Sequence, residues 1–255
     1  MTKRTDIIWI ERVDSTNEEV KRHISDIDNL SVLSAFEQTA GRGQRGNTWT
    51  SNAGENLLFS IVVKFGQDGI EPLQAYDQFV ISEIAALSVV DLLAINDIEA
   101  RVKWPNDIYV GTEKICGILI ENSLSGSELS HSIIGIGLNV NQTEFDPTLP
   151  NPTSMQIISG ERYDTHGILE QFTDIFKDYL DRYCHIKGGY GRLRKLYLAQ
   201  MWRKDEPSTF IDHTSEQPAE FKGTIRGLSD VGHMLMENEE GELREFAFKE
   251  ISYIL

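Results

Sequence analysis

Four short apolar runs, each of strand length, constrain the fold of this chain more than any other feature of its sequence. Residues 32–36 and 57–63 are mostly apolar and flank a polar, glycine-rich stretch at 38–56. Residues 115–121 and 132–140 are similar runs further along the chain. Short apolar runs that are bounded by turn-forming residues are typical of buried strands. The sequence therefore predicts a largely buried sheet.

Helical patterns lie before, between and after these runs. Ser15 and Glu18 form a capping-box pattern, which starts a helix just after a short strand at residues 7–10. A sparse apolar stripe continues this helix to Ile27. The longest helical periodicity covers residues 73–95. Two further helices are predicted, at residues 166–184 and 190–203.

The C-terminal part of the chain has a different character. Short alternating runs follow one another at residues 219–226, 233–236 and 243–248, with turn signals between them. Such spacing is typical of a small β-barrel. We therefore expect an α+β fold in which residues 1–205 form the main domain and residues 206–255 form an appended barrel.

The charge balance excludes whole classes of partner. The chain carries 24 basic and 40 acidic residues, a formal net charge of −16. This acidity opposes binding to nucleic acid and to anionic lipid, because both depend on Lys and Arg neutralising phosphate. No apolar stretch approaches the ~18 residues of a membrane-spanning helix, and the two cysteines lack metal-ligand spacing. We expect a soluble, cytoplasmic protein with no membrane or nucleic-acid partner, which meets any anionic ligand through a local basic feature.

A basic, glycine-rich loop is the first candidate site. No acidic residue occurs between Glu37 and Glu55, although this stretch contains Arg42 and Arg45. Three glycines within residues 41–46 allow positive φ and close backbone approach, so successive N–H groups can face one anion. The spacing also matches G-x-G-x-x-G, but no helix start follows, which argues against a dinucleotide fold. We interpret the stretch as an anion-binding loop, with a flexible surface loop as the alternative.

A second candidate site lies on a predicted hairpin. A strand over residues 100–110 is expected to turn through a tight two-residue loop and to pair with the strand that follows. In this register Asp107 lies opposite Cys116. Lys103, Asp107 and Lys114 then share one face of the sheet. A catalytic cluster and a solvated hairpin face with a surface salt bridge both fit this pattern, so both interpretations stay open.

A third candidate feature is a pair of glycines within a strand. Gly135 and Gly137 interrupt an otherwise apolar run, and Asn139 follows at its end. Glycine in a strand interior indicates that another backbone or a ligand packs close, although a strand bulge explains the pattern as well. Asn139 would place an amide for ligand recognition beside these glycines.

Together these segments resemble the biotin–protein ligase family. The resemblance implies a mixed central sheet with flanking helices, like that of class II aminoacyl-tRNA synthetases, and a small C-terminal SH3-like β-barrel. The Lys-Trp-Pro-Asn-Asp string is the most specific match. Six motifs occur in the family's order, namely Asp14-Ser15-Thr16-Asn17; Gln38 with Gly41-Arg42-Gly43-x-Arg45-Gly46-x-x-Trp49; Lys103-Trp104-Pro105-Asn106-Asp107; Lys114 with Cys116-Gly117-Ile118-Leu119; Gly135-x-Gly137-x-Asn139; and Pro152-Thr153-Ser154.

The resemblance also implies an activity and the residues that perform it. ATP and Mg²⁺ would convert biotin to biotinyl-5'-AMP, and the biotinyl group would pass to a lysine of a biotin carboxyl carrier protein. The residues implied to bind biotin are Ser15, Thr16, Gln38, Gly41, Arg42, Lys114 and Gly117. Those implied to bind ATP are Arg45, Trp49, Asn106 and Asn139, with Asn106 and Asp107 near Mg²⁺. The catalytic residues would be Arg42, Lys103, Asp107 and Lys114.

The chain departs from the family at two points. Gln44 stands where some relatives carry arginine, which puts one phosphate contact in question. The residues before Val13 are too few for the winged-helix domain of relatives that repress transcription, so we expect a ligase without DNA binding. A homodimer is compatible with the sequence. Two alternatives stay open: a lipoate–protein ligase, which shares the adenylate chemistry, and a non-catalytic biotin sensor.

Overall fold

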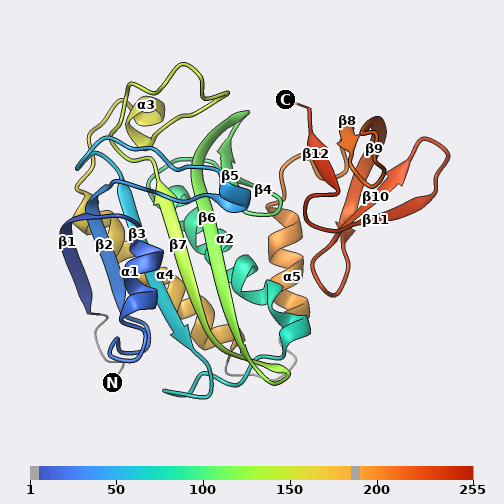
Figure 1. Cartoon of the computed structure of the whole chain (residues 1–255). Helices are drawn as coiled ribbons and strands as arrows, with labels where there is room; N and C mark the ends of the chain where they lie inside the picture. The colour runs from blue at the N-terminus through green and yellow to red at the C-terminus, as the bar shows by residue number, and fades with distance from the viewer. Residues whose placement is uncertain (1–5, 185–189, 255) are drawn as a thin grey trace.

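The central feature of the molecule is a seven-stranded mixed sheet. In the computed structural model, which describes residues 6–184 and 190–254, its strands follow the order β1-β2-β3-β7-β6-β5-β4 (Figure 1). β1 and β2 pair in parallel, and the other neighbouring strands pair antiparallel. The predicted mixed sheet is therefore confirmed. Its strands are β1 (Ile7–Val13), β2 (Val32–Gln38), β3 (Leu57–Lys64), β4 (Arg101–Lys103), β5 (Asp107–Val110), β6 (Glu113–Ser125) and β7 (Glu128–Leu138).

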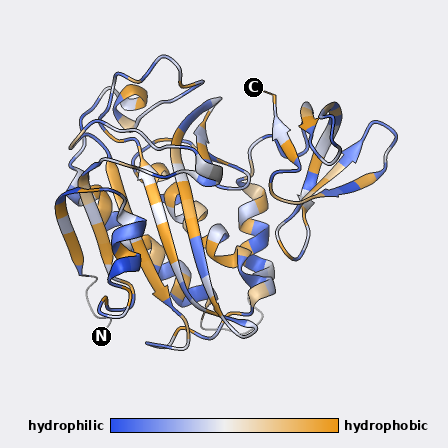
Figure 2. Cartoon of the chain, in the orientation of Figure 1, coloured by the Kyte–Doolittle hydropathy of each residue, from blue (hydrophilic) through white to orange (hydrophobic). Residues whose placement is uncertain are grey.

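Helices cover one face of this sheet. Helix α2 (Phe79–Ala94) is apolar around its whole circumference and is buried along nearly all of its length (Figure 2). Helix α4 (Thr165–Tyr183) packs beside it with one apolar face, and α5 (Tyr190–Ala199) packs on its other side. Their buried side chains form one continuous core with β3, β6 and β7. In the described part of the chain, no helix is both long and apolar enough to cross a membrane.

The opposite face of the sheet is covered more sparsely, by helix α1 (Thr16–Arg22). Alternate strand residues point to opposite faces, so Leu33, Val62 and Ile133 pack with Val20 of α1 in a second, smaller cluster. The helix ends at Arg22 and not at Ile27 as predicted, and the residues that follow form turns. The helix predicted over residues 73–95 is a 3-10 turn, η2 (Ala75–Asp77), followed by α2, and the helix predicted over residues 190–203 ends at Ala199. Helix α3 (Met155–Ser159) and the 3-10 turn η1 (Gln44–Gly46) were not predicted from the sequence.

The C-terminal residues form a second sheet. Its strand order is β11-β10-β9-β8-β12, antiparallel throughout. β12 pairs back onto β8, which leaves β11 at the far edge, and within residues 190–254 these two edge strands do not pair with each other. The predicted SH3-like barrel is therefore not confirmed, and the division into 1–205 and 206–255 stays a prediction. The strands are β8 (Pro207–Asp212), β9 (Ala219–Leu228), β10 (Met234–Asn238), β11 (Leu243–Phe246) and β12 (Ile251–Tyr253).

The predicted strand over residues 100–110 is two strands. β4 and β5 are separated by Trp104-Pro105-Asn106 and fold back on each other, so that Lys103 pairs with Asp107. Proline has no N–H to give to a strand ladder, which favours a break at this point. The hairpin brings the two charged residues of the motif directly opposite each other.

Candidate active site

One pocket of about 300 Å³ collects most of the predicted residues. Its walls come from the start of α1, the loop after β2, the turns around β4, β5 and β6, the glycines of β7, and strand β12 of the second sheet. An adjoining cleft of about 470 Å³ shares Trp49, Lys103, Asp107 and Lys114 with this pocket and includes Asn139. The side chain of Arg45 lies outside the described residues. The predicted residues that line the first pocket are Ser15, Thr16, Gln38, Arg42, Trp49, Lys103, Asn106, Asp107, Lys114 and Gly117.

Neutral polar groups form one end of the pocket. Ser15 and Thr16 are each 3% exposed at the start of α1. The side-chain oxygen of Gln38 accepts hydrogen bonds from the backbone N–H of Thr16 at 2.7 Å and from its hydroxyl at 3.2 Å. Ser15 occupies the helix N-cap, but its side chain forms no capping bond, so the predicted capping box with Glu18 is not formed. Its hydroxyl is thereby left for the pocket.

Arg42 lies in a loop that folds back as a small hairpin. A bridge joins Arg42 to Thr48, and the N–H of Trp49 donates to the carbonyl of Gly41 at 3.0 Å. A Cβ added at Gly41 would lie 2.4 Å from the carbonyl oxygen of Trp49, so only glycine allows this close approach. The guanidinium Nη1 of Arg42 contacts Glu18. The loop is thus attached to α1 by its arginine.

The indole of Trp49 lies against two glycines of the sheet. Gly117 and Gly137 face each other across β6 and β7. A Cβ added at Gly117 would lie 2.8 Å from the Trp49 ring, and one at Gly137 would lie 2.4 Å from it. A Cβ at Gly135 would lie 2.4 Å from Asn17 Oδ1. The close packing predicted at the β7 glycines is present, but side chains provide it and not another backbone or a ligand. The strands carry no register shift there, which excludes the bulge.

The structure brings the three charged residues of the predicted hairpin cluster together. Lys114 Nζ lies 2.7 Å from Asp107 Oδ1, and both side chains are mostly buried. Lys103 pairs with Asp107 across β4 and β5, and its Nζ donates to the hydroxyl of Tyr109 at 2.9 Å. Its ammonium also lies 5.1 Å from the ring of Tyr253, on β12. The cluster lines the pocket, which favours a functional site over a solvated hairpin face.

One detail of the predicted hairpin was wrong. Asp107 lies opposite Gly117 and not opposite Cys116, because the register shifts between Ile108 and Tyr109. Such a bulge places one extra residue on one strand. Lys114 stays opposite Tyr109, diagonal to Asp107, and the two side chains still form an ion pair.

The two asparagines are anchored by their amide nitrogens. Asn106 donates from Nδ2 to the carbonyl of Ile118 at 2.8 Å. Asn139 is 4% exposed and donates from Nδ2 to the carbonyl of Thr153 at 2.9 Å. Each amide is thus fixed in one orientation, with its oxygen as the remaining acceptor.

A model of the biotin/lipoate A/B protein ligase family matches residues 9–139, just over half of the chain. The chain belongs to this family. A biotin–(acetyl-CoA-carboxylase) ligase of Paracoccus denitrificans is 30% identical over 240 residues, which cover 90% of this chain and 93% of that protein. The bifunctional ligase/repressor BirA of Bacillus spizizenii is 32% identical over 216 residues, 83% of this chain and 62% of that protein. The biotin protein ligase of Aquifex aeolicus in complex with biotin and ATP has a TM-score of 0.78 at 28% identity, covering 97% of both chains.

Several residues of the ligase site were missed by the sequence analysis. Asn17 stands in a quoted motif but received no role, and Glu121 and Lys21 were not considered at all. Asn17 hydrogen-bonds to Glu121, about a hundred residues further along the chain, and no local sequence pattern predicts such a contact. Tyr253 was expected in a separate barrel, yet β12 lines the pocket.

Proposed function

We propose that the chain is an ATP-dependent biotin–protein ligase that forms biotinyl-5'-AMP and transfers biotin to one lysine of a biotin carboxyl carrier protein. The observation that carries the proposal is the composition of a single pocket. Neutral donors and acceptors line one end, and the cationic groups of Arg42, Lys103 and Lys114 are among the residues that line the rest. A ligand with an uncharged polar ring and a carboxylate matches this division. The names of the relatives supply the acceptor class.

The neutral end fits the ureido ring of biotin. A buried polar heterocycle needs its donors and acceptors satisfied. Ser15 and Thr16 offer hydroxyls, and Gln38 offers its amide, whose oxygen is already oriented by Thr16. Gly41 and Gly117 contribute backbone that lies close to the loop and to the sheet. This end therefore selects a polar bicyclic ring over a thin, apolar dithiolane.

The cationic groups address the main obstacle of the first step, the repulsion between two anions. A carboxylate oxygen of biotin attacks the α-phosphorus of ATP, a phosphorus–oxygen bond forms, and pyrophosphate leaves. Arg42, Lys103 and Lys114 would bring the two anions together and stabilise the charge that grows on the departing pyrophosphate. A forked guanidinium suits the carboxylate and phosphate oxygens in particular.

The adjoining cleft fits the nucleoside part of ATP. Trp49 lines both this cleft and the first pocket, and its flat indole would provide a stacking surface for adenine. Asn139 lines the cleft with an amide whose orientation is fixed by Thr153. Arg45 stays assigned to ATP as a prediction. The loop at residues 38–56 would close over the adenylate and exclude water.

Mg²⁺ fits the site as an ion shared with the nucleotide. Within the described residues, no group of three His, Cys, Asp or Glu side chains is arranged to hold a metal. Asp107 offers a carboxylate, and Asn106 offers the amide oxygen that its bond to Ile118 leaves available. Magnesium usually takes one or two protein oxygens and completes its shell with phosphate and water. When bound it would neutralise charge on the phosphates.

The second step needs a neutral lysine amine on the carrier. The amine attacks the acyl carbon of biotinyl-5'-AMP, an amide bond forms, and the bond to AMP breaks. Asp107 would orient the amine and take up its proton. Lys114, 2.7 Å from Asp107, would remain with the departing AMP.

A mass measurement tests the proposal. The chain is incubated with biotin, MgATP and a biotin carboxyl carrier domain, and the carrier should gain the mass of one biotinyl group. A carrier in which the acceptor lysine is replaced by arginine should gain none. Modification by lipoate in preference to biotin would establish the lipoate–protein ligase instead. Biotin binding without biotin-dependent ATP–pyrophosphate exchange would establish the non-catalytic sensor.

We also infer that the chain does not bind DNA as a repressor. The net charge of −16 supports this, because phosphate neutralisation by Lys and Arg dominates affinity for DNA. Fluorescence anisotropy with a labelled duplex should detect no binding at physiological salt, with or without biotin and ATP. Salt-sensitive binding would contradict the inference.

A further inference from the structure

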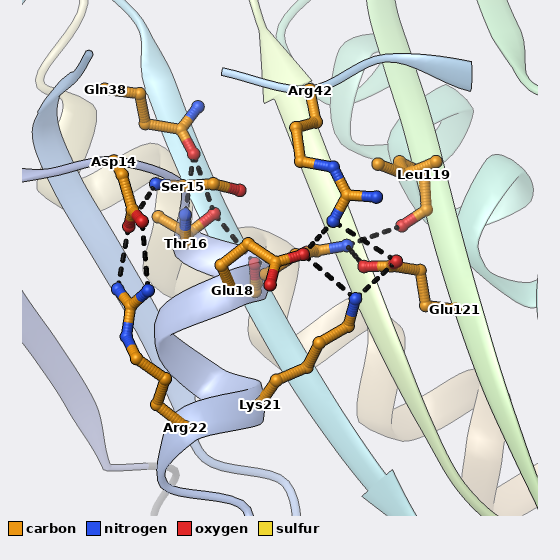
Figure 3. A network of polar contacts seen from close by, with 12 residues as sticks. Asp14, Ser15, Thr16, Glu18, Lys21, Arg22, Gln38, Arg42, Leu119 and Glu121 are labelled. Carbon is orange, nitrogen blue, oxygen red and sulfur yellow. Dashed lines mark hydrogen bonds and ion pairs between the residues drawn. The ribbon is translucent and has the colours of Figure 1, made fainter. Parts of the chain in front are cut away.

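A continuous chain of hydrogen bonds links the two ends of the pocket (Figure 3). It begins at Gln38, whose side-chain oxygen accepts from Thr16. The hydroxyl of Ser60, which is fully buried on β3, contacts the Thr16 hydroxyl at 2.8 Å and Asn17 Oδ1 at 2.6 Å. Asn17 then donates from Nδ2 to Glu121 Oε2 at 2.9 Å. The proposed ring-binding end is thereby connected to a carboxylate on β6.

The side chain of Asn17 is fixed on every side. It is 3% exposed, and its Nδ2 also donates to the carbonyl of Leu119 at 3.3 Å. The absent side chain of Gly135 leaves the space that its amide fills, since a Cβ there would lie 2.4 Å from Oδ1. Both polar atoms of the amide are engaged, so its orientation is determined. Asn17 therefore presents a fixed donor to Glu121.

Glu121, held by Asn17, in turn contacts Arg42. Its Oε1 lies 2.6 Å from Lys21 Nζ and 3.3 Å from Arg42 Nη1. Glu18 of α1 contacts the same two cations, with 3.0 Å between Glu18 Oε1 and Lys21 Nζ. Two carboxylates and two cations thus alternate and balance in charge, as Figure 3 shows. The loop arginine is held between a helix and a strand.

The charge state of this cluster is defined. Burial alone raises the pKa of the Glu121 carboxyl, but the hydrogen bonds from Lys21 and Asn17 outweigh it and bring the pKa below its ordinary value. Glu121 is therefore a carboxylate at neutral pH. Lys21 balances the two acids, which would otherwise repel a ligand carboxylate arriving at Arg42.

We propose that Asn17 and Glu121 are positioning residues for the biotin carboxylate: they orient the guanidinium of Arg42 toward the pocket without touching substrate themselves. This inference rests on the proposed function. Both acids are met by Nη1 of Arg42, and a guanidinium carries further N–H donors on Nη2 and Nε, which remain in a fork suited to a carboxylate. The contacts at Nη1 thus fix the orientation of the Arg42 guanidinium and leave its Nη2 and Nε donors available for substrate.

The choice of asparagine at position 17 follows from the same contacts. Asn17 Nδ2 donates to a carboxylate and to a backbone carbonyl. An aspartate would have no donor there and would place a second negative charge against Glu121. Asn17→Asp should therefore disturb the orientation of the Arg42 guanidinium as Glu121→Gln does, although neither Asn17 nor Glu121 is proposed to touch the substrate.

Glu121→Gln tests the proposal, with Glu19→Gln as the matched control. Glutamine keeps an oxygen for Asn17 but removes one of the two carboxylate charges that hold Arg42, and leaves that of Glu18. Glu19 lies next to Glu18 on the same helix and pairs with Arg22, so the control removes the same charge without reaching Arg42. In ATP–pyrophosphate exchange, Glu121→Gln should raise the KM for biotin about fivefold to tenfold. This is the effect of losing one charge-assisted hydrogen bond whose contribution is reduced by partial exposure to solvent. The KM for ATP, the melting temperature and the Glu19→Gln variant should stay near the parent values.

A double-mutant cycle separates positioning from a structural role. In an Arg42→Gln background, Glu121→Gln should have no further effect on the KM for biotin, because the two residues act as one unit. Full additivity, an unchanged KM, or tighter biotin binding by Glu121→Gln would each overturn the proposal. If the unsubstituted chain lacks biotin-dependent exchange, the proposed function fails instead. In that case, calorimetric titration of the same variants with biotin tests the positioning role independently of the exchange activity.

Discussion

Asp107 and Lys114 form an ion pair across the β5–β6 hairpin, with 2.7 Å between Oδ1 and Nζ. The same ammonium lies 5.5 Å from the ring centroid of Trp49, and a Cβ at Gly117 would lie 3.3 Å from it. The pair keeps a positive charge at the junction of the two clefts in a chain of net charge −16. An arriving phosphate would draw Lys114 away and release Asp107 for the amine or for Mg²⁺.

Lys114→Ala should therefore slow adenylation without unfolding the protein. We expect biotin-dependent pyrophosphate exchange to fall about a hundredfold, the usual cost of removing one preorganised donor to developing charge. The melting temperature should change little, because the pair lies at the edge of the pocket and not in the core. Lys195→Ala, on the exposed side of α5, is the control. Near-parental exchange by Lys114→Ala would remove this lysine from the mechanism.

Arg42→Gly should make the adenylate leak. The variant loses the contacts that attach the loop to α1 and β6 and gains backbone freedom. Biotinyl-5'-AMP would then escape or meet water and foreign amines. Incubation with biotin, MgATP and an unrelated lysine-rich protein, read by streptavidin blot, should show labelling at least about tenfold above the parent. Arg42→Lys, which keeps the charge, should leak less. Labelling of the unrelated protein at the parental level in both variants would contradict the prediction.

The glycines of β7 show how far the sequence predicts the site. Gly135 and Gly137 predicted that another backbone or a ligand packs close against the strand; the close approach is there, but side chains make it. The identity of what packs there was not predictable, because Asn17 and Trp49 come from distant elements whose placement depends on the whole sheet. Composition and spacing thus determined where the ligand-facing surface lies, and only the tertiary fold determined what covers it.

The hairpin and the C-terminal sheet show where sequence patterns failed. The tight turn after Val110 was predicted correctly, but one extra residue on β6, Ile115, moved Asp107 opposite Gly117. No residue type marks such a bulge. In the C-terminal region, period-two alternation predicted β9, β10 and β11, but it missed β8 and β12 and gave no information on closure. Strand closure depends on which edges meet, and β12 pairs with β8 in a sheet whose other edge is β11.

Gly137→Ala and Gly135→Ala should weaken the binding of different substrates. The two positions lie on one face of one strand, and each added Cβ would come 2.4 Å from a neighbour, the Trp49 ring at 137 and Asn17 Oδ1 at 135. Gly137→Ala should raise the KM for ATP about tenfold, whereas Gly135→Ala should raise the KM for biotin by a similar factor, since overpacking costs about 1–3 kcal/mol. Each variant serves as the control for the other. Equal effects on both substrates would contradict the division of the site.

Glu83 should give the protein a pH-dependent stability. Its side chain is wholly buried in α2, where Arg194 and Tyr197 of α5 face it. Burial raises the pKa of Glu83 from an ordinary 4.5 to about 7, although the nearby Arg194 opposes this rise. The folded protein then binds a proton that the unfolded chain releases between these two values. The contribution of Glu83 to stability is therefore full below about pH 4.5 and declines as pH rises through about 7.

Urea titrations of the parent and of Glu83→Gln, at several values between about pH 5 and pH 8, measure this contribution as a difference. The glutamine is neutral throughout. The difference in free energy of unfolding, variant minus parent, should therefore increase as pH rises and become constant above about pH 7. Glu240→Gln, an exposed change in the turn after β10, should run parallel to the parent. A difference that does not vary with pH would mean that Arg194 keeps Glu83 charged across this range, and that the ion pair outweighs burial.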